Sequence, residues 1–334
     1  MRIPLSVLDL APVPTGTTPS QAIRRTVDLA RLAEKLGYVR VWFAEHHGMP
    51  SVASAAPEIL IGHVASATNT IRVGAGGIML PNHTPLKVAE TFRTLEALHP
   101  GRIDLGLGRA PGSDQAASRA LEASDGHDFS EQLSELLAFC GQTSFAANHP
   151  FRKVIAIPDD VPLPPIWILG SSGASARLAG SAGMGYSFAS HFSPTPAGPA
   201  FNTYADSFKP SAQFPKPHAI LGVAVVCAET DEAADHLATT MDLAWLRIRR
   251  GEFRPLPSPE EARAYPYTEF ERDAVREYRS RTVIGSPQKV KARIESLARD
   301  SGADEVMVVS NLHGHAERLR SYMLLADVLI HPHG

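Results

Sequence analysis

Short runs of apolar residues alternate along the chain with longer stretches in which apolar residues recur every three or four positions. The short runs predict β-strands, and the longer stretches predict amphipathic α-helices. Strands are predicted at residues 2–10, 39–44, 71–76, 102–108, 165–170, 186–190, 219–228 and 305–310. Helices are predicted at residues 20–37, 57–68, 87–98, 130–139, 174–183, 231–250, 287–301 and 316–330.

The alternation of strand and helix predicts parallel β/α units. The predicted strands are too apolar to have one face in water, and eight strands are the number that closes a barrel. The predicted fold is therefore an α/β (β/α)8 TIM barrel that forms a single domain over residues 1–334. An open, doubly wound sheet is the alternative.

Two stretches exceed ordinary loop length, residues 191–218 and residues 251–282. Loops of this length in a compact domain are usually lids, binding loops or mobile segments. We expect them to be insertion loops over the barrel mouth, by which we mean the carboxyl-terminal end of the barrel strands. One follows the sixth strand, and the other precedes the last helix–strand unit.

Composition excludes several classes of partner. The formal net charge of −3 leaves no basic surface for nucleic acid. No stretch approaches the ~20 apolar residues that a membrane span needs, and Pro4, Asp9 and Pro12 interrupt any signal peptide. Cys140 and Cys227 lie far apart, match no metal-binding spacing and suit a reducing compartment. These features predict a cytoplasmic protein.

Unusual polar or glycine-rich clusters follow five of the predicted strands. Because the carboxyl ends of parallel strands meet at one end of a barrel, where barrel enzymes carry their chemistry, we expect these clusters to form one site. The clusters are residues 45–47, 75–85, 106–114, 170–175 and 190–192.

The sequence GSSGAS at residues 170–175 opens a predicted helix with glycine and serine. Backbone N–H groups at a helix amino terminus, with hydroxyl groups nearby, suit a phosphate. Plain capping of the helix by Ser171 or Ser172 is the alternative. The number of small and hydroxyl residues favours a phosphate site.

The sequence GLGRAPG at residues 106–112 resembles a dinucleotide-binding fingerprint only superficially. Its glycine spacing is wrong, and Pro111 prevents a helix from opening there. We interpret Arg109 instead as a cation that leaves the strand end toward an anionic or electron-rich ligand.

The pair His46-His47 raises the question of a metal site. Neighbouring residues on a strand point in opposite directions, so the two imidazoles are not expected to bind one ion together. No other strand end supplies an evident set of ligands, and we predict no metal. We expect His46 to face the barrel mouth, where it could act as a base or a hydrogen-bonding group, and His47 to point the other way with Glu45.

Together these motifs resemble those of the bacterial-luciferase-like family of flavin-dependent monooxygenases, in its single-chain oxidoreductase branch. The order, spacing and strand positions of the motifs all agree. The stretches that carry the resemblance are VWFAEHHG (41–48), IRVGAGGIMLPNHTPLKVAE (71–90), LHPGRIDLGLGRAPG (98–112) and PIWILGSSGASARLAG (165–180).

The resemblance implies reduced FMN and O2, which react through a C4a-hydroperoxyflavin to oxygenate a small organic substrate. His46 is the implied catalytic residue, and a cis peptide bond is implied between Gly76 and Gly77. The implied cofactor-binding residues are Ala75, Gly76, Gly77, Arg109, Gly170, Ser171, Ser172 and Ser175. At the position of Ser171, the luciferase subunit itself has an acidic residue.

The same resemblance implies partners. A separate flavin reductase would supply reduced FMN, and a homodimer is the implied assembly. A hydride-transfer enzyme that uses the deazaflavin F420, and a flavin-binding protein without turnover, are the alternatives. The side chains expected to line an apolar or aromatic substrate pocket are His191, Phe192, Phe201, Tyr204, Tyr265 and Tyr267.

Overall fold

Eight parallel strands close into a barrel in the computed structural model, which describes residues 3–110 and 112–332. The order around the barrel is β1-β2-β3-β5-β6-β7-β8-β10, and β10 pairs with both β8 and β1. Their bounds are β1 Leu5–Asp9, β2 Arg40–Phe43, β3 Arg72–Ala75, β5 Ile103–Gly108, β6 Ile166–Gly170, β7 Gly185–Ala189, β8 Ala219–Cys227 and β10 Glu305–Val309. The predicted (β/α)8 barrel is confirmed, and the open sheet is excluded.

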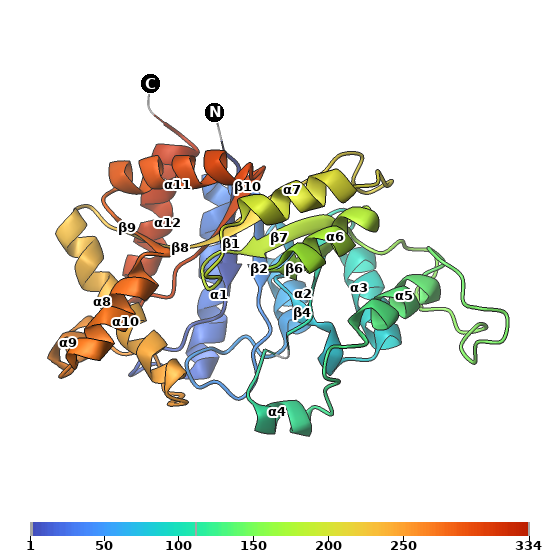
Figure 1. Ribbon diagram of the computed structural model, residues 1–334, viewed down its shortest axis with the longest axis horizontal. Coiled ribbons are helices and arrows are strands. Elements are labelled where there is room, and N and C mark those ends of the chain that lie inside the picture. Colours follow the sequence, from blue (N-terminus) through green and yellow to red (C-terminus); the bar gives the residue numbers. More distant parts are fainter. Residues whose placement is uncertain (1–2, 111, 333–334) are drawn as a thin grey trace.

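Helices cover the outside of the strands (Figure 1). Their bounds are α1 Pro19–Leu36, α2 Pro57–Ala67, α3 Pro85–Leu98, α5 Phe129–Phe139, α6 Gly173–Ser181, α7 Gly198–Ser207, α8 Asp231–Arg249, α11 Pro287–Ser301 and α12 His315–Leu329. Local sequence sets their ends. In α1, Thr18 and Gln21 form a reciprocal capping box, and the helix ends at Gly37, whose φ of 80° suits glycine. No helix in the described part of the chain is long and apolar enough to cross a membrane.

The two stretches expected to be insertion loops contain regular structure. Residues 191–218 include α7, the helix of the β/α unit between β7 and β8, which packs on α6. Residues 251–282 include α9 (Pro259–Ala264) and α10 (Glu269–Arg279), and they lead into β9 (Thr282–Gly285). Strand β9 pairs with the carboxyl half of β8. Short elements α4 (Gln115–Ala120), β4 (Ile78–Met79) and the 3-10 helix η1 (Leu80–Asn82) also lay outside the prediction.

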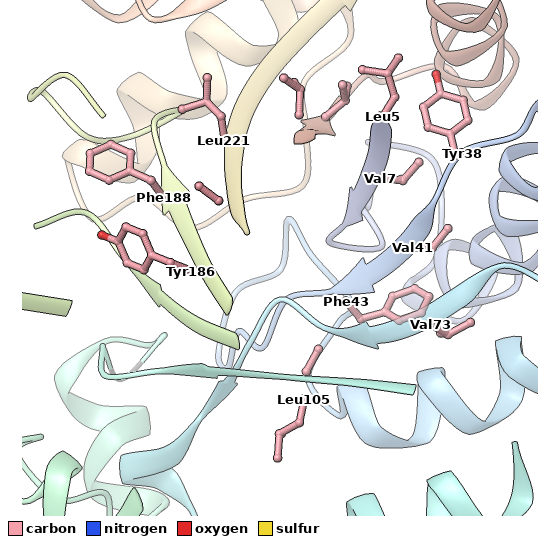
Figure 2. Close-up of a cluster of buried hydrophobic side chains, with 14 of the residues drawn as sticks. Leu5, Val7, Tyr38, Val41, Phe43, Val73, Leu105, Tyr186, Phe188 and Leu221 are labelled. Atoms are coloured by element: carbon pink, nitrogen blue, oxygen red, sulfur yellow. The ribbon is translucent and has the colours of Figure 1, made fainter. Parts of the chain in front are cut away.

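Alternation along the strands divides their side chains between two cores. Val41 and Phe43 of β2 belong to the apolar layer between barrel and helices, part of which Figure 2 shows. Trp42, between them, lies inside the barrel, where its ring centroid is 5.4 Å from that of Trp167 on β6. Because β2 and β6 are not neighbours, this contact requires both indoles to point toward the barrel axis.

A buried charge network fills the barrel interior near the amino ends of the strands. Arg40 donates to Asp104 at 2.8 Å and to Glu305 at 2.9 and 3.0 Å, and its guanidinium lies 4.7 Å from the Trp167 ring centroid. Burial alone would raise the pKa of Asp104, but Arg40 and Arg72 outweigh it and hold that pKa below its usual value. The network occupies this end of the interior, so the opposite end is the one open to ligands.

Candidate functional site

The polar clusters that follow β2, β3 and β5 meet at the barrel mouth, as predicted. The carbonyl of Gly112, beyond β5, accepts from the backbone N–H of His47 at 3.2 Å. It also lies 3.2 Å from Nδ1 of His46. The loop after β5 is therefore attached directly to the end of β2, and neither cluster stands alone.

Glu45 is the hub of this region, a role that the sequence did not reveal. Its carboxylate is fully buried and accepts from the Met79 backbone N–H and from Asn82 Nδ2, each at 2.8 Å. Nε2 of His83 lies 2.9 Å away, and Nε2 of His47 lies 2.8 Å away. The contact with His47 confirms that Glu45 and His47 share one direction. Glu45 thereby ties the end of β2 to the segment that contains β4 and η1.

The electrostatics of Glu45 and His83 are coupled. Burial would raise the pKa of Glu45, but hydrogen bonding and charge from His83 outweigh burial, so the pKa is lowered. Burial would lower the pKa of His83, but the same carboxylate outweighs burial, so that pKa is raised. Each residue therefore favours the charged form of the other.

His46 points away from Glu45 and into the mouth. Its backbone N–H donates to Ser54 O at 3.1 Å. His191, which follows β7, also faces the barrel interior, because its ring lies against Gly222 of β8, between the interior residues Ile220 and Ala224. Burial lowers the pKa of His46 itself, which keeps the imidazole neutral.

The tautomer of His46 follows from its partner. A carbonyl oxygen can only accept, so Nδ1 must carry the hydrogen that it donates to Gly112 O. In a neutral imidazole the other nitrogen, Nε2, is then a hydrogen-bond acceptor. His46 therefore presents a basic nitrogen that no protein group uses in the described part of the structure.

The segment after β3 has no room for side chains. The peptide bond between Gly76 and Gly77 is cis, as the resemblance implies. A Cβ on Gly76 would lie 2.7 Å from Leu8, and one on Gly77 would lie 2.8 Å from the Gly106 carbonyl oxygen. Ala75 is fully buried at the end of β3. Both glycines are buried, and neither position could hold a side chain without moving its neighbours.

The serine turn, residues 170–175, leads into helix α6. Ser172 does not cap this helix with its side chain. Ser172 occupies the N-cap position, but its side chain accepts no hydrogen bond from the helix. Ser171 and Ser172 are exposed, whereas Ser175 donates to the Ser172 carbonyl at 2.9 Å. A Cβ at Gly170 would collide with the Ser175 hydroxyl. The first-turn N–H groups and two hydroxyls are therefore available to an anion.

Tyr186 supports this turn and was missed by the sequence analysis. Its hydroxyl donates to the Ser172 carbonyl at 3.1 Å and lies 3.2 Å from Ser175 Oγ. Burial raises the pKa of Tyr186, so the phenol stays protonated and can donate. Tyr186 falls within a predicted strand, where a tyrosine is most simply interpreted as a residue of the hydrophobic core.

Arg109 directly follows β5 and is exposed. Among residues 3–110 and 112–332 no carboxylate pairs with it. No helix begins directly after β5, since α4 starts at Gln115, which agrees with the rejection of a dinucleotide fingerprint. Pro111, part of that reasoning, lies outside the described residues.

The predicted aromatic pocket is wrong for Phe201 and Tyr204. Phe201 and Tyr204 are buried on α7, and the Tyr204 hydroxyl donates to the Met184 carbonyl below β7. Tyr265 and Tyr267 pack on one another, with ring centroids 4.8 Å apart. Of the expected lining residues, His191 is the one shown to face the mouth. In the described part of the chain, no three His, Cys, Asp or Glu side chains gather to hold a metal ion.

Comparison with known proteins decides the family. The model of the luciferase-like monooxygenase family matches residues 3–305. The chain belongs to this family. It is 48% identical to the Bacillus subtilis (strain 168) protein YvbT, over 97% of this chain and 96% of the relative. It is 43% identical to a luciferase-like monooxygenase of Escherichia coli (strain K12), over 98% and 97%. It is also 32% identical to the N-acetyl-S-alkylcysteine monooxygenase of Bacillus subtilis (strain 168), over 98% of each.

Solved structures agree with this assignment. The crystal structure of apo-MsnO8 superposes with a TM-score of 0.87 at 39% identity and covers 98% of both chains. The oxygenating constituent of 3,6-diketocamphane monooxygenase from Pseudomonas putida, in complex with FMN, gives a TM-score of 0.73 at 18% identity, over 98% of both chains. An F420-dependent secondary alcohol dehydrogenase gives 0.71 at 14%, over 98% of this chain and 99% of that one. The last two show a shared fold only.

Proposed function

We propose that the protein is a flavin-dependent monooxygenase that uses reduced FMN and O2 to oxygenate a small, apolar organic substrate. The proposal rests on the arrangement of side chains at the barrel mouth. A neutral imidazole with a free acceptor nitrogen, His46, shares one barrel end with an anion-binding turn at residues 170–175. The monooxygenase names of the family model and of two relatives support the same reaction class.

The residues of the mouth fit FMN. A phosphate needs N–H and O–H donors and positive charge, and the start of α6, Ser171, Ser172 and the exposed Arg109 offer these. A flat ring needs a close approach to the backbone, and Gly76 and Gly77 carry no side chain that would block it. When bound, reduced FMN would supply the electrons that activate oxygen.

The chain's own residues would then do three things. The serine turn, with Ser175 held by Tyr186, would bind the phosphate. Ala75, Gly76 and Gly77 would support the ring with backbone. His46 Nε2 would accept a hydrogen bond from the reacting oxygen group and could take up its proton. General acid–base catalysis of this kind contributes on the order of 10²–10⁴ in rate.

A deazaflavin-dependent hydride transfer is the second candidate. An F420-dependent dehydrogenase has the same fold. The phosphate turn alone does not separate the two cofactors, because both carry a phosphate. The two differ in their use of oxygen: hydride transfer by F420 does not consume it.

The proposal also includes the protein's partners and its cellular compartment. Reduced FMN would come from a separate reductase, since β5 ends at Gly108 and the next helix begins only at Gln115, whereas a dinucleotide-binding turn leads directly into a helix. A homodimer would cover exposed apolar side chains such as Ile59 on α2 and Leu98 on α3. Cys140 and Cys227 are free thiols, which supports a reducing compartment such as the cytoplasm.

The deciding experiment supplies the protein with chemically reduced FMN or reduced F420 and follows oxygen uptake with a panel of small thioethers, ketones and aldehydes. The proposal expects FMN binding in the micromolar range or tighter, and oxygen uptake coupled to product with at least one compound. Product formation with F420 and no oxygen uptake would establish the second candidate instead.

A further inference from the structure

The side chain of Met79 lies inside the barrel mouth. Met79 on β4 pairs with Gly108 at the end of β5, and residues paired across parallel strands point to the same face of the sheet. That face is the interior one, because Asp104, four residues earlier on β5, accepts a hydrogen bond from Nε1 of the interior Trp42 at 3.0 Å. The Met79 thioether is therefore at the carboxyl end of the strands and faces the barrel axis.

Two glycines leave room for this thioether. A Cβ on Gly108 would lie 2.8 Å from Met79 Sδ and 2.9 Å from Met79 Cε. A Cβ on Gly112 would lie 3.1 Å from Met79 Cγ. The carbonyl of the same Gly112 lies 3.2 Å from His46 Nδ1, and Arg109 directly follows Gly108. The Met79 side chain thus lies next to the parts of the chain that carry His46 and Arg109, two residues of the proposed flavin site.

A second methionine provides a comparison elsewhere on the molecule. Met79 and Met323 are both partly exposed, whereas Met184, Met241 and Met307 are buried. Met323 lies on α12, one of the helices that cover the outside of the barrel (Figure 1). An oxidant dissolved in the solvent therefore reaches both partly exposed thioethers, whereas an oxidant formed in the mouth meets Met79 first.

Reduced flavin provides such an oxidant when it reacts with oxygen in the absence of a substrate. The reaction transfers two electrons and two protons to O2 and yields oxidised flavin and hydrogen peroxide. A thioether then takes one oxygen atom from hydrogen peroxide: an S=O bond forms, the O–O bond breaks, and the other oxygen leaves as water. The sulfur loses two electrons and the peroxide gains two, so methionine becomes methionine sulfoxide.

We propose that Met79 is a modification site, whose sulfur is converted to the sulfoxide by hydrogen peroxide that forms at the bound flavin without substrate. The inference rests on the proposed function, which supplies the reduced flavin and the oxygen. A sulfoxide is polar and adds an oxygen atom to a side chain that already lies against Gly108 and Gly112. Oxidation therefore crowds the mouth and weakens FMN binding, which limits the wasteful release of peroxide.

The first test asks whether the Met79 sulfur belongs to the flavin site, and it involves no turnover. Flavin-free protein is treated with dilute hydrogen peroxide, with and without oxidised FMN, and the sulfoxides are quantified by peptide mass spectrometry. Bound FMN should slow the oxidation of Met79 at least about fivefold and leave that of Met323 unchanged, because the ring covers the mouth. Equal rates at Met79 with and without bound FMN would overturn the proposal.

The second test generates the oxidant at the site. Chemically reduced FMN is added repeatedly to the protein under ¹⁸O2 without a substrate, and catalase destroys the peroxide that escapes into the solvent. Met79 should gain one labelled oxygen atom at least about tenfold faster than Met323. Equal labelling of the two methionines, or no label at Met79, would contradict the proposal.

The variants M79L and M323L form a matched pair, because leucine has nearly the volume of methionine and each variant retains the other's thioether. Both are treated with hydrogen peroxide without flavin, and their FMN affinity is then measured by fluorescence titration. Treated M323L should bind FMN at least about fivefold more weakly than before treatment, whereas treated M79L should stay within about twofold. An equal loss of affinity in both variants would show that the Met79 sulfoxide does not control FMN binding.

The inference and the proposed function fail in different ways. If untreated wild-type protein binds no FMN, the proposed function fails and the inference fails with it. If wild-type protein binds FMN and couples oxygen uptake to product, but Met79 gains no label, the inference fails alone and the proposed function survives.

Discussion

Replacing Glu45 by glutamine tests the hub of the site without creating a cavity. Glu45 is fully buried and receives hydrogen bonds from two histidines, an asparagine and a backbone amide. The amide of glutamine is nearly the same size but turns an N–H group toward these donors and removes the charge that pairs with His83. Breaking a buried pair costs about 3–5 kcal/mol. We expect Glu45→Gln to lower the free energy of unfolding by about that amount, measured by urea denaturation at pH 6.

The difference in the free energy of unfolding between wild type and Glu45→Gln should depend on pH. The pKa of Glu45 is lowered in the folded state, so its contribution is present above its unfolded value of about 4.3 and is lost as pH falls through the folded pKa. The pKa of His83 is raised, so its contribution is present below about 6.5 and is lost as pH rises through the folded pKa. The stability gap should therefore be largest between about pH 5 and 6.5 and smaller at pH 9.

Glu34 provides the matched control. Burial would raise its pKa, but hydrogen bonds from the backbone amides of Thr70, Ile71 and Asn69 outweigh burial and lower it to about 2, and no histidine takes part. Glu34→Gln should therefore lose its effect only toward acid pH. A gap for Glu45→Gln below about 1 kcal/mol, or one equal at pH 6 and pH 9, would refute the assignment of Glu45 as the hub.

Three further predictions follow from the site and the barrel interior. Replacing Ser171 and Ser172 together by alanine should weaken FMN binding by about 2–3 kcal/mol in a fluorescence titration, because two hydrogen bonds to a charged phosphate are lost; unchanged affinity would rule out the phosphate site. His46→Ala should keep FMN affinity within a few-fold and lose most coupled oxygen uptake, whereas His47→Ala should chiefly cost stability; intact coupling in the first variant would contradict the role of His46. Arg40→Met should lower the free energy of unfolding by about 3–5 kcal/mol, because it removes the buried cation that pairs with both Asp104 and Glu305, and a denaturation midpoint equal to wild type would disprove this.

The barrel could be predicted because its signal is local. Each barrel strand is a short apolar run, and the predicted strand and helix positions match the structure to within a few residues. Helices α7 and α10 were missed for different reasons. Prolines at 194, 196 and 199 obscure the start of α7, whereas the capping pair Thr268 and Glu271 before α10 was a usable signal.

The candidate site was only partly predictable, because its contacts join distant parts of the chain. The direction of His46 follows from strand alternation, and the cis bond at Gly76-Gly77 from family resemblance. Glu45 meets His83 only because the segment after β3 folds back to the end of β2. His191 turns into the barrel only because Gly222, on β8, leaves room for its ring.

The fate of molecular oxygen tests the central claim most directly. The protein, chemically reduced FMN and the panel of small apolar compounds are incubated under ¹⁸O2, and the products are analysed by mass spectrometry. A flavin-dependent monooxygenase predicts a product with one labelled oxygen atom, formed by wild-type protein and nearly absent with His46→Ala. A product without label, or turnover that requires F420 and proceeds without oxygen, would contradict the account.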